Sequence, residues 1–130
     1  EKAHNIEELR SRITLMEQNC YIDTTEAAEL RKKVEIALEN PTVKEWFSDI
    51  WSEVKSEAEI IADGNVRRPD RVMIRGSRAV VVDYKFGENE ERRYHTQMHN
   101  YVELLHKMGR YDSIEGYIWY ITLGKIERVV

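Results

Sequence analysis

Four apolar residues in a row, Ala79–Val82, are followed at once by Asp83-Tyr84-Lys85. A short apolar run of this kind is typical of a strand that is buried on both faces, so we expect it in the middle of a β-sheet. Side chains two residues apart in a strand project from the same face, which places Asp83 beside Lys85. The chain is therefore expected to fold around a sheet that carries a charged pair near its centre.

The segments on either side alternate between helical and extended patterns. Apolar residues at three-to-four spacing predict helices in the first fifty-odd residues. One starts at the signal Asp23-Thr24-Thr25-Glu26, which offers a capping hydroxyl or carboxylate, and ends at Asn40-Pro41. Thr42 is expected to cap a short helix carrying Trp46 and Trp51. Strands are expected over 57–62, 69–74, 79–86, 116–121 and 126–130, and a helix over 91–108. This order predicts an α/β (α+β) fold, in which a central mixed β-sheet is flanked by helices.

Length and composition narrow the class of protein. The 130 residues suit a single domain, with a helical part over 1–55 and the meander, helix and last strands over 56–130. No stretch approaches the ~18–20 apolar residues of a membrane-spanning helix, so we expect no membrane partner. Cys20 is the single cysteine, which excludes a disulfide framework, and the expected compartment is the cytoplasm. The chain begins at Glu1 rather than at methionine, which suggests a piece of a longer protein.

Charge is distributed unevenly along the chain. The formal net charge of −4 argues against a protein that holds nucleic acid by bulk electrostatics. Five arginines nevertheless fall within twelve positions, at Arg67, Arg68, Arg71, Arg75 and Arg78. This cluster is either a local basic surface for a polyanion or a solvated edge of a hairpin, and charge alone does not separate the two.

Carboxylates stand where strands are normally apolar. Asp83 lies in the most hydrophobic strand, Asp70 precedes it on the neighbouring hairpin strand, and Glu57 lies on the strand before that. Three such groups on one side of a sheet repel each other unless a cation binds them, and hard oxygen ligands favour Mg²⁺ or Mn²⁺. The alternative is an ordinary Asp83–Lys85 ion pair, with Asp70 as a hairpin cap.

Two short motifs carry a family resemblance. Pro69-Asp70, followed thirteen residues later by Asp83-Tyr84-Lys85, resembles the Pro-Asp…(Asp/Glu)-x-Lys motif of the restriction-endonuclease-like, or PD-(D/E)XK, nuclease superfamily. Gln97-Met98-His99-Asn100-Tyr101 resembles the Gln-x-x-x-Tyr element of its RecB-like branch. The stretch from Glu57 to Val130 is also similar to the C-terminal nuclease domains of UvrD-type helicases.

The resemblance implies a role for each motif residue. Asp70, Asp83 and the Tyr84 carbonyl would bind Mg²⁺ or Mn²⁺, Glu57 would be an accessory carboxylate, and Lys85 would be the catalytic lysine. On the following helix, Gln97 and Tyr101 would orient Lys85, the attacking water or the DNA backbone. The arginines expected to contact DNA are Arg67, Arg68 and Arg71. Some members of this branch also bind metal through an N-terminal histidine, for which His4 is the candidate.

The implied function is metal-dependent hydrolysis of DNA, most simply by an exonuclease domain of a helicase–nuclease in repair or recombination. Its partners would be DNA, a helicase domain of the same polypeptide and a second nuclease subunit, with ATP used only by that helicase domain. Two alternatives stay open. One is an inactive nuclease-like module that binds DNA or acts as a scaffold, and the other is a hydrolase of a different phosphate ester.

The remaining residues that could carry chemistry have ordinary explanations. His95 and His99 are four residues apart and could bind a metal, but the sequence favours a solvated or DNA-facing helix surface over a metal pair. Cys20 lacks the histidine partner of a nucleophile. The tyrosines between Tyr111 and Tyr120 are expected in a strand and the core rather than on a base-stacking surface.

Overall fold

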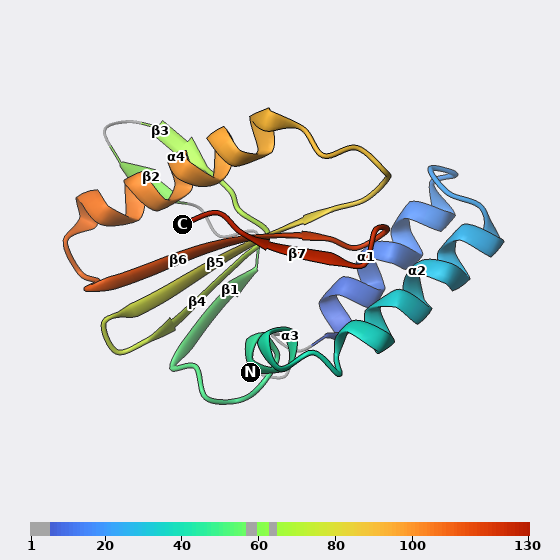
Figure 1. Ribbon diagram of the computed structural model, residues 1–130, viewed down its shortest axis with the longest axis horizontal. Helices are drawn as coiled ribbons and strands as arrows, with labels where there is room; N and C mark the ends of the chain where they lie inside the picture. Colours follow the sequence, from blue (N-terminus) through green and yellow to red (C-terminus); the bar gives the residue numbers. More distant parts are fainter. Residues whose placement is uncertain (1–5, 57–59, 63–64) are drawn as a thin grey trace. The chain divides into compact units, whose positions relative to one another are not determined.

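The computed structural model of the protein describes residues 6–56, 60–62 and 65–130 (Figure 1). The chain divides into two compact units, Glu1–Asp49 and Ile50–Val130. The first unit contains helices and the second contains the β-sheet.

The first unit is built from a pair of packed helices and a short third helix. α1 (Glu7–Gln18) and α2 (Thr24–Ala37) lie side by side, with Leu9 and Ile13 of α1 buried. The start of α2 follows from its sequence. The Asp23 carboxylate accepts a hydrogen bond from the Glu26 N–H at 2.8 Å, and the Glu26 carboxylate accepts one from the Asp23 N–H at 2.9 Å. The expected helix start at Asp23 is thus confirmed.

The third helix begins earlier and ends earlier than expected. α3 (Pro41–Trp46) is capped by Asn40, whose side-chain oxygen accepts a hydrogen bond from the Thr42 N–H at 2.8 Å. The expectation that Thr42 is the cap was wrong, because proline has no N–H to satisfy and its fixed φ suits the first helical position. Trp51 lies beyond the end of α3.

The second unit contains a five-stranded mixed sheet in the order β1-β4-β5-β6-β7 (Figure 1). The strands are β1 (Glu53–Ser56), β4 (Arg71–Arg75), β5 (Arg78–Lys85), β6 (Ser113–Tyr120) and β7 (Lys125–Arg128). β5 and β6 are parallel and the other neighbours are antiparallel. The central place of β5 and the mixed α+β architecture are both confirmed, and they are consistent with a restriction-endonuclease-like fold.

The segment before β4 differs from the expected single strand. Residues Glu53–Ser56 form β1 against β4, whereas β2 (Ile60–Ala62) and β3 (Asn65–Arg67) form a separate two-stranded hairpin. The strand β1 was not expected, since its sequence Glu-Val-Lys-Ser is mostly polar and its side chains are mostly exposed. Glu57 lies outside the described residues.

Helix α4 (Arg92–Met108) connects the two parallel strands and lies across one face of the sheet (Figure 1). It ends at Gly109, whose φ of 69° is the left-handed conformation expected of that cap. Its buried side chains pack with residues of β4, β5 and β6 in one cluster: Val72, Ala79, Val81, Met98, Tyr101, Val102, Leu104, Leu105, Ile114, Ile118 and Tyr120. The odd-numbered residues of β5 therefore face α4.

Close approach of α4 to the sheet depends on Gly116 in β6. A Cβ atom at this position would lie 2.8 Å from both Cγ and Sδ of Met98 and 3.1 Å from Cγ2 of Val102. Only glycine leaves room for these two side chains.

Burial of the opposite face of β5 confirms the two-sided pattern expected for this strand. Val80, Val82 and Tyr84 are all buried. The Tyr84 ring packs edge-on against Trp119, with 5.8 Å between the ring centroids. In the part of the chain that the structure describes, no helix is long and apolar enough to cross a membrane.

Candidate active site

The β4–β5 hairpin brings the two motif aspartates together. Arg75 pairs with Arg78 across the Gly76-Ser77 turn, and the pairing continues without a break to Arg71 opposite Val82. Asp70 directly precedes Arg71, so it lies opposite Asp83. Directly opposite residues of an antiparallel pair project from the same face. The thirteen-residue spacing is therefore the spacing that a tight hairpin needs to make the two carboxylates neighbours.

Each carboxylate is bound by the main chain of the opposite strand segment. The Asp70 N–H donates a hydrogen bond to Asp83 Oδ1 at 3.0 Å. In return, the Tyr84 N–H donates to Asp70 Oδ2 at 2.8 Å. These two bonds fix the orientation of both carboxylates and leave one oxygen of each outside this exchange.

Asp83 is a buried carboxylate in an unfavourable electrostatic environment. The residue is 4% exposed. Burial, and after it the negative charge of Asp70, raise the pKa of Asp83 to about 6, although the Asp70 N–H and the Lys85 ammonium act in the opposite direction. A cation placed between the carboxylates would remove both destabilising effects, because it would neutralise the charges that burial and repulsion disfavour.

Lys85 projects from the same face as Asp83, as expected for residues two apart in a strand. Its Nζ lies 3.6 Å from Asp83 Oδ2 and donates a hydrogen bond to Gln97 Oε1 at 3.1 Å. Gln97 is on α4, which covers this face of the sheet. The β4–β5 hairpin and α4 thus bring together four of the expected residues: Asp70, Asp83, Lys85 and Gln97.

The donor set suits a hard divalent cation. Asp70 and Asp83 offer carboxylate oxygens, and these are the ligands that Mg²⁺ and Mn²⁺ prefer. Within the described ranges, no group of three His, Cys, Asp or Glu side chains is arranged to hold a metal. A cation here would therefore need oxygen ligands beyond the two aspartates, such as main-chain carbonyls or water. Glu57 and His4, the other expected ligands, lie outside the described residues.

Main-chain atoms of Tyr84 are held in place at this site. Its N–H is engaged by Asp70, and its side chain is anchored against Trp119 on the opposite face of the sheet. Coordination of a metal by the Tyr84 carbonyl stays a prediction, since only the position of the residue is observed.

The other expected site residues lie in positions that suit their expected roles less well. Tyr101 is 3% exposed and belongs to the core cluster under α4, so it supports the helix that carries Gln97. Arg71 is fully buried, a position that does not suit the expected contact with DNA. Arg68 is exposed next to Asp70, and Arg67 lies in β3. Contacts of these residues with DNA stay predictions.

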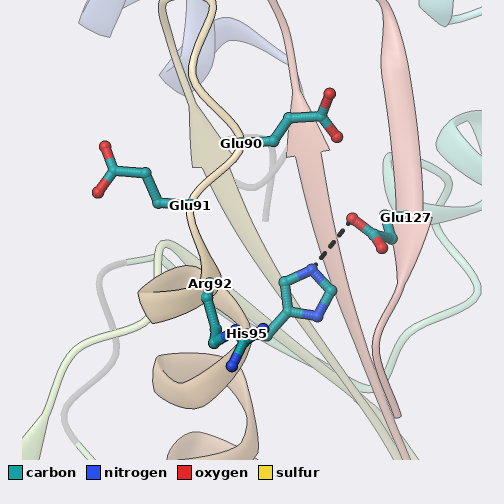
Figure 2. A pocket seen from close by; sticks show the side chains of 5 residues that line it. All are labelled: Glu90, Glu91, Arg92, His95 and Glu127. Atoms are coloured by element: carbon teal, nitrogen blue, oxygen red, sulfur yellow. Dashed lines mark hydrogen bonds and ion pairs between the residues drawn. The ribbon is translucent and has the colours of Figure 1, made fainter.

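The histidines of α4 do not form the pair considered from sequence. His95 Nε2 lies 3.2 Å from Glu127 Oε1 of β7, in an open hollow of about 300 Å³ (Figure 2). This hollow is lined by Glu90, Glu91, Arg92, His95 and Glu127. His99 is exposed, in agreement with the solvated helix surface.

One residue near the site was missed from the sequence. Tyr94 lies one helical turn before Gln97, and its ring centroid is 4.4 Å from Lys85 Nζ. The spacing of Tyr94 and Gln97 could have indicated this position, because residues three apart share a helix face.

Comparison with known proteins agrees with the geometry. A search of curated proteins found no match. The family model of the PD-(D/E)XK nuclease superfamily, by contrast, matches residues 3–129 of the 130. Members of this superfamily are generally nucleases and typically use divalent metals such as Mg²⁺. With the match covering nearly the whole chain and the aspartates and lysine of the motif gathered on one face of the sheet, the chain belongs to the PD-(D/E)XK nuclease superfamily.

Proposed function

We propose that this domain is a Mg²⁺-dependent deoxyribonuclease that hydrolyses phosphodiester bonds, and that it acts as an exonuclease. The observation that supports this most is the grouping of Asp70, Asp83 and Lys85 on one sheet face, with Asp83 buried beside a second carboxylate. Family membership makes a nuclease-type function the expected one.

The two aspartates would hold the cation. A bound Mg²⁺ would polarise the scissile phosphate and make a water molecule more acidic. Asp70 and Asp83 are already oriented by the main-chain hydrogen bonds described above. The Tyr84 carbonyl and Glu57 are proposed as further ligands.

Lys85 would stabilise charge in the transition state. As the water oxygen bonds to phosphorus and the bridging P–O bond breaks, negative charge grows on the phosphoryl oxygens. The Lys85 ammonium, held by Gln97, is a donor placed beside the expected position of that phosphate. Arg68, which is exposed next to Asp70, is proposed to bind an adjacent phosphate of the DNA backbone.

Cleavage of DNA by the purified chain tests the proposal. With Mg²⁺, the wild-type protein is expected to cut DNA, and chelation by EDTA is expected to stop it. Asp83→Ala and Lys85→Ala should each lower kcat by at least about a hundredfold, the usual effect of removing one electrostatic group of a catalytic site. Lys107→Ala, which removes an exposed lysine near the end of α4, is the matched control and should retain activity.

The substrate form separates the exonuclease from other candidates. An exonuclease degrades linear DNA and leaves closed circular DNA intact, whereas an endonuclease cuts both. Binding of DNA without cleavage by the folded wild-type protein in Mg²⁺ and in Mn²⁺ would instead favour the inactive DNA-binding module. Cleavage of a simple phosphate ester but not of DNA would favour a different phosphoesterase.

The biological context is proposed from the resemblance to UvrD-type helicase domains. The chain would be part of a longer cytoplasmic helicase–nuclease for DNA repair or recombination, with a second nuclease subunit as a partner. A P-loop ATP-binding motif in the same reading frame, upstream of Glu1, is the expected finding. A frame that encodes no such motif would contradict this context without affecting the nuclease assignment.

A further inference from the structure

The Lys85 ammonium is contacted by an aromatic ring as well as by polar groups. Its Nζ lies 4.4 Å from the centroid of the Tyr94 ring, 3.1 Å from Gln97 Oε1 and 3.6 Å from Asp83 Oδ2. A cation within about 6 Å of a ring centroid, over the ring face, is attracted by the negative charge density of that face. Lys85 is therefore held by two residues of one helix turn, Tyr94 and Gln97.

Tyr94 is itself fixed by its surroundings. Its hydroxyl donates a hydrogen bond to Glu91 Oε2 at 3.2 Å. Its ring packs against that of Tyr120, with 6.3 Å between centroids, and Tyr120 is the residue of β6 that pairs with Lys85. The Arg93 guanidinium also lies 5.3 Å from the Tyr94 ring, but its side chain is 75% exposed and pairs with Glu91.

Lysine side chains are flexible, and a lysine beside two carboxylates has more than one favourable position. An ion pair with Asp83 alone would draw Nζ toward the carboxylates and toward any cation bound there. The Tyr94 ring and the Gln97 amide both attract Nζ toward α4, so the ammonium lies between the acidic pair and the helix.

We propose that Tyr94 is a positioning residue for Lys85, which uses the face of its ring to hold the ammonium where it meets the scissile phosphate. The contact itself is independent of the reaction, while its catalytic consequence rests on the proposed nuclease function. Two variants separate the ring from the hydroxyl. Tyr94→Phe retains the ring and loses the bond to Glu91, whereas Tyr94→Leu removes the ring.

The contact is tested by NMR of the lysine ε-methylene groups in the full chain without metal. An aromatic ring shifts nearby proton resonances upfield, so one lysine signal, assigned with a Lys85→Arg sample, should stand apart in the wild type. That shift should persist in Tyr94→Phe and disappear in Tyr94→Leu. The proposal would be overturned if the Lys85 signal coincided with those of the exposed lysines, or if its chemical shift were the same in Tyr94→Leu as in the wild type.

The consequence is tested by steady-state cleavage of DNA with Mg²⁺. Tyr94→Leu is expected to lower kcat by about three- to thirtyfold, the range for a cation–π contact, with KM unchanged. Tyr94→Phe should restore kcat, and Arg93→Gln, which removes the other cation from the same ring, should match the wild type. Circular dichroism confirms that each variant is folded.

The outcomes are distinguishable. Equal losses of kcat in Tyr94→Phe and Tyr94→Leu would assign the effect to the Glu91 hydrogen bond and overturn the role of the ring. An unchanged kcat in Tyr94→Leu would overturn it as well. A wild-type chain that cuts no DNA would contradict the proposed function, and the lysine signals would still decide whether Tyr94 positions Lys85.

Discussion

Asp70 lies opposite Asp83 at the open end of the β4–β5 hairpin, and its N–H donates a hydrogen bond to the Asp83 carboxylate at 3.0 Å. The same hairpin end places Lys85 Nζ 3.6 Å from Asp83. The β4–β5 hairpin thus holds two aspartates and a lysine. Helix α4 contributes Tyr94 and Gln97, which contact the lysine.

Stability of the metal-free protein should fall as pH rises through the range in which Asp83 ionises. Its pKa is about 6 in the fold against an ordinary value of 3.8 for an aspartate, so the folded state binds more protons than the unfolded state between these values. Stability is therefore greatest below about pH 4 for this group and is lost toward pH 6, by up to about 3 kcal/mol. Urea unfolding in EDTA at several pH values measures this change.

Asp83→Asn should remove most of that slope, because an amide does not ionise. Asp112→Asn, at an exposed aspartate, is the control and should follow the wild-type profile. Equal slopes in the wild type and in Asp83→Asn would show that Asp83 does not titrate in this range.

Mg²⁺ should stabilise the wild-type fold through the aspartate pair. A ligand that binds only the folded state adds about 1.4 kcal/mol when its concentration is ten times Kd. Thermal unfolding with increasing Mg²⁺ should show a rising Tm for the wild type and a constant Tm for Asp83→Ala. An equal rise in both proteins would place the cation elsewhere.

Gln97→Ala should lower kcat by about ten- to a hundredfold without changing KM for DNA, because it removes the acceptor of the Lys85 ammonium. A hydrogen bond to a charged group contributes about 1.5–3 kcal/mol, and each 1.36 kcal/mol is a factor of ten in rate. Asn100→Ala, at an exposed position on the same helix, is the control for helix propensity. Steady-state kinetics on linear DNA separates the two parameters, and a change confined to KM would assign Gln97 to DNA binding.

Gly116→Val should destabilise the second unit by about 1–3 kcal/mol, the usual cost of inserting atoms into a packed core. The added Cβ alone would lie 2.8 Å from the Met98 side chain. Chemical unfolding measures the loss, and Met98→Ala in the same protein should recover part of it. An unchanged stability would show that α4 can move away from β6 at little cost.

The parts of the site that follow from local geometry were predictable from sequence. Asp83 and Lys85 share a face because they are two apart in a strand, and Asp70 meets Asp83 because thirteen residues with a two-residue turn form a hairpin. The central place of β5 followed from its run of valines, which are buried.

The parts that depend on tertiary packing were not predictable. The mostly polar strand β1 forms because β4 offers it a partner, not because of its own pattern. Arg71 was expected at the surface and is fully buried, since a basic residue in a short strand gives no local sign of its surroundings. Tyr94 reaches Lys85 only through the docking of α4 on the sheet.

The two-residue turn at Gly76-Ser77, with Gly76 at a φ of 61°, has a consequence for how this domain tolerates changes of length. Inserting one residue into the hairpin would shift the register of β5 against β4 by one residue, and every side chain of β5 would move to the opposite face. Asp83 would then turn away from Asp70 while the strands stayed paired. A change of length at this hairpin would therefore separate the two carboxylates, so relatives that use this aspartate pair should have no insertion or deletion in the turn.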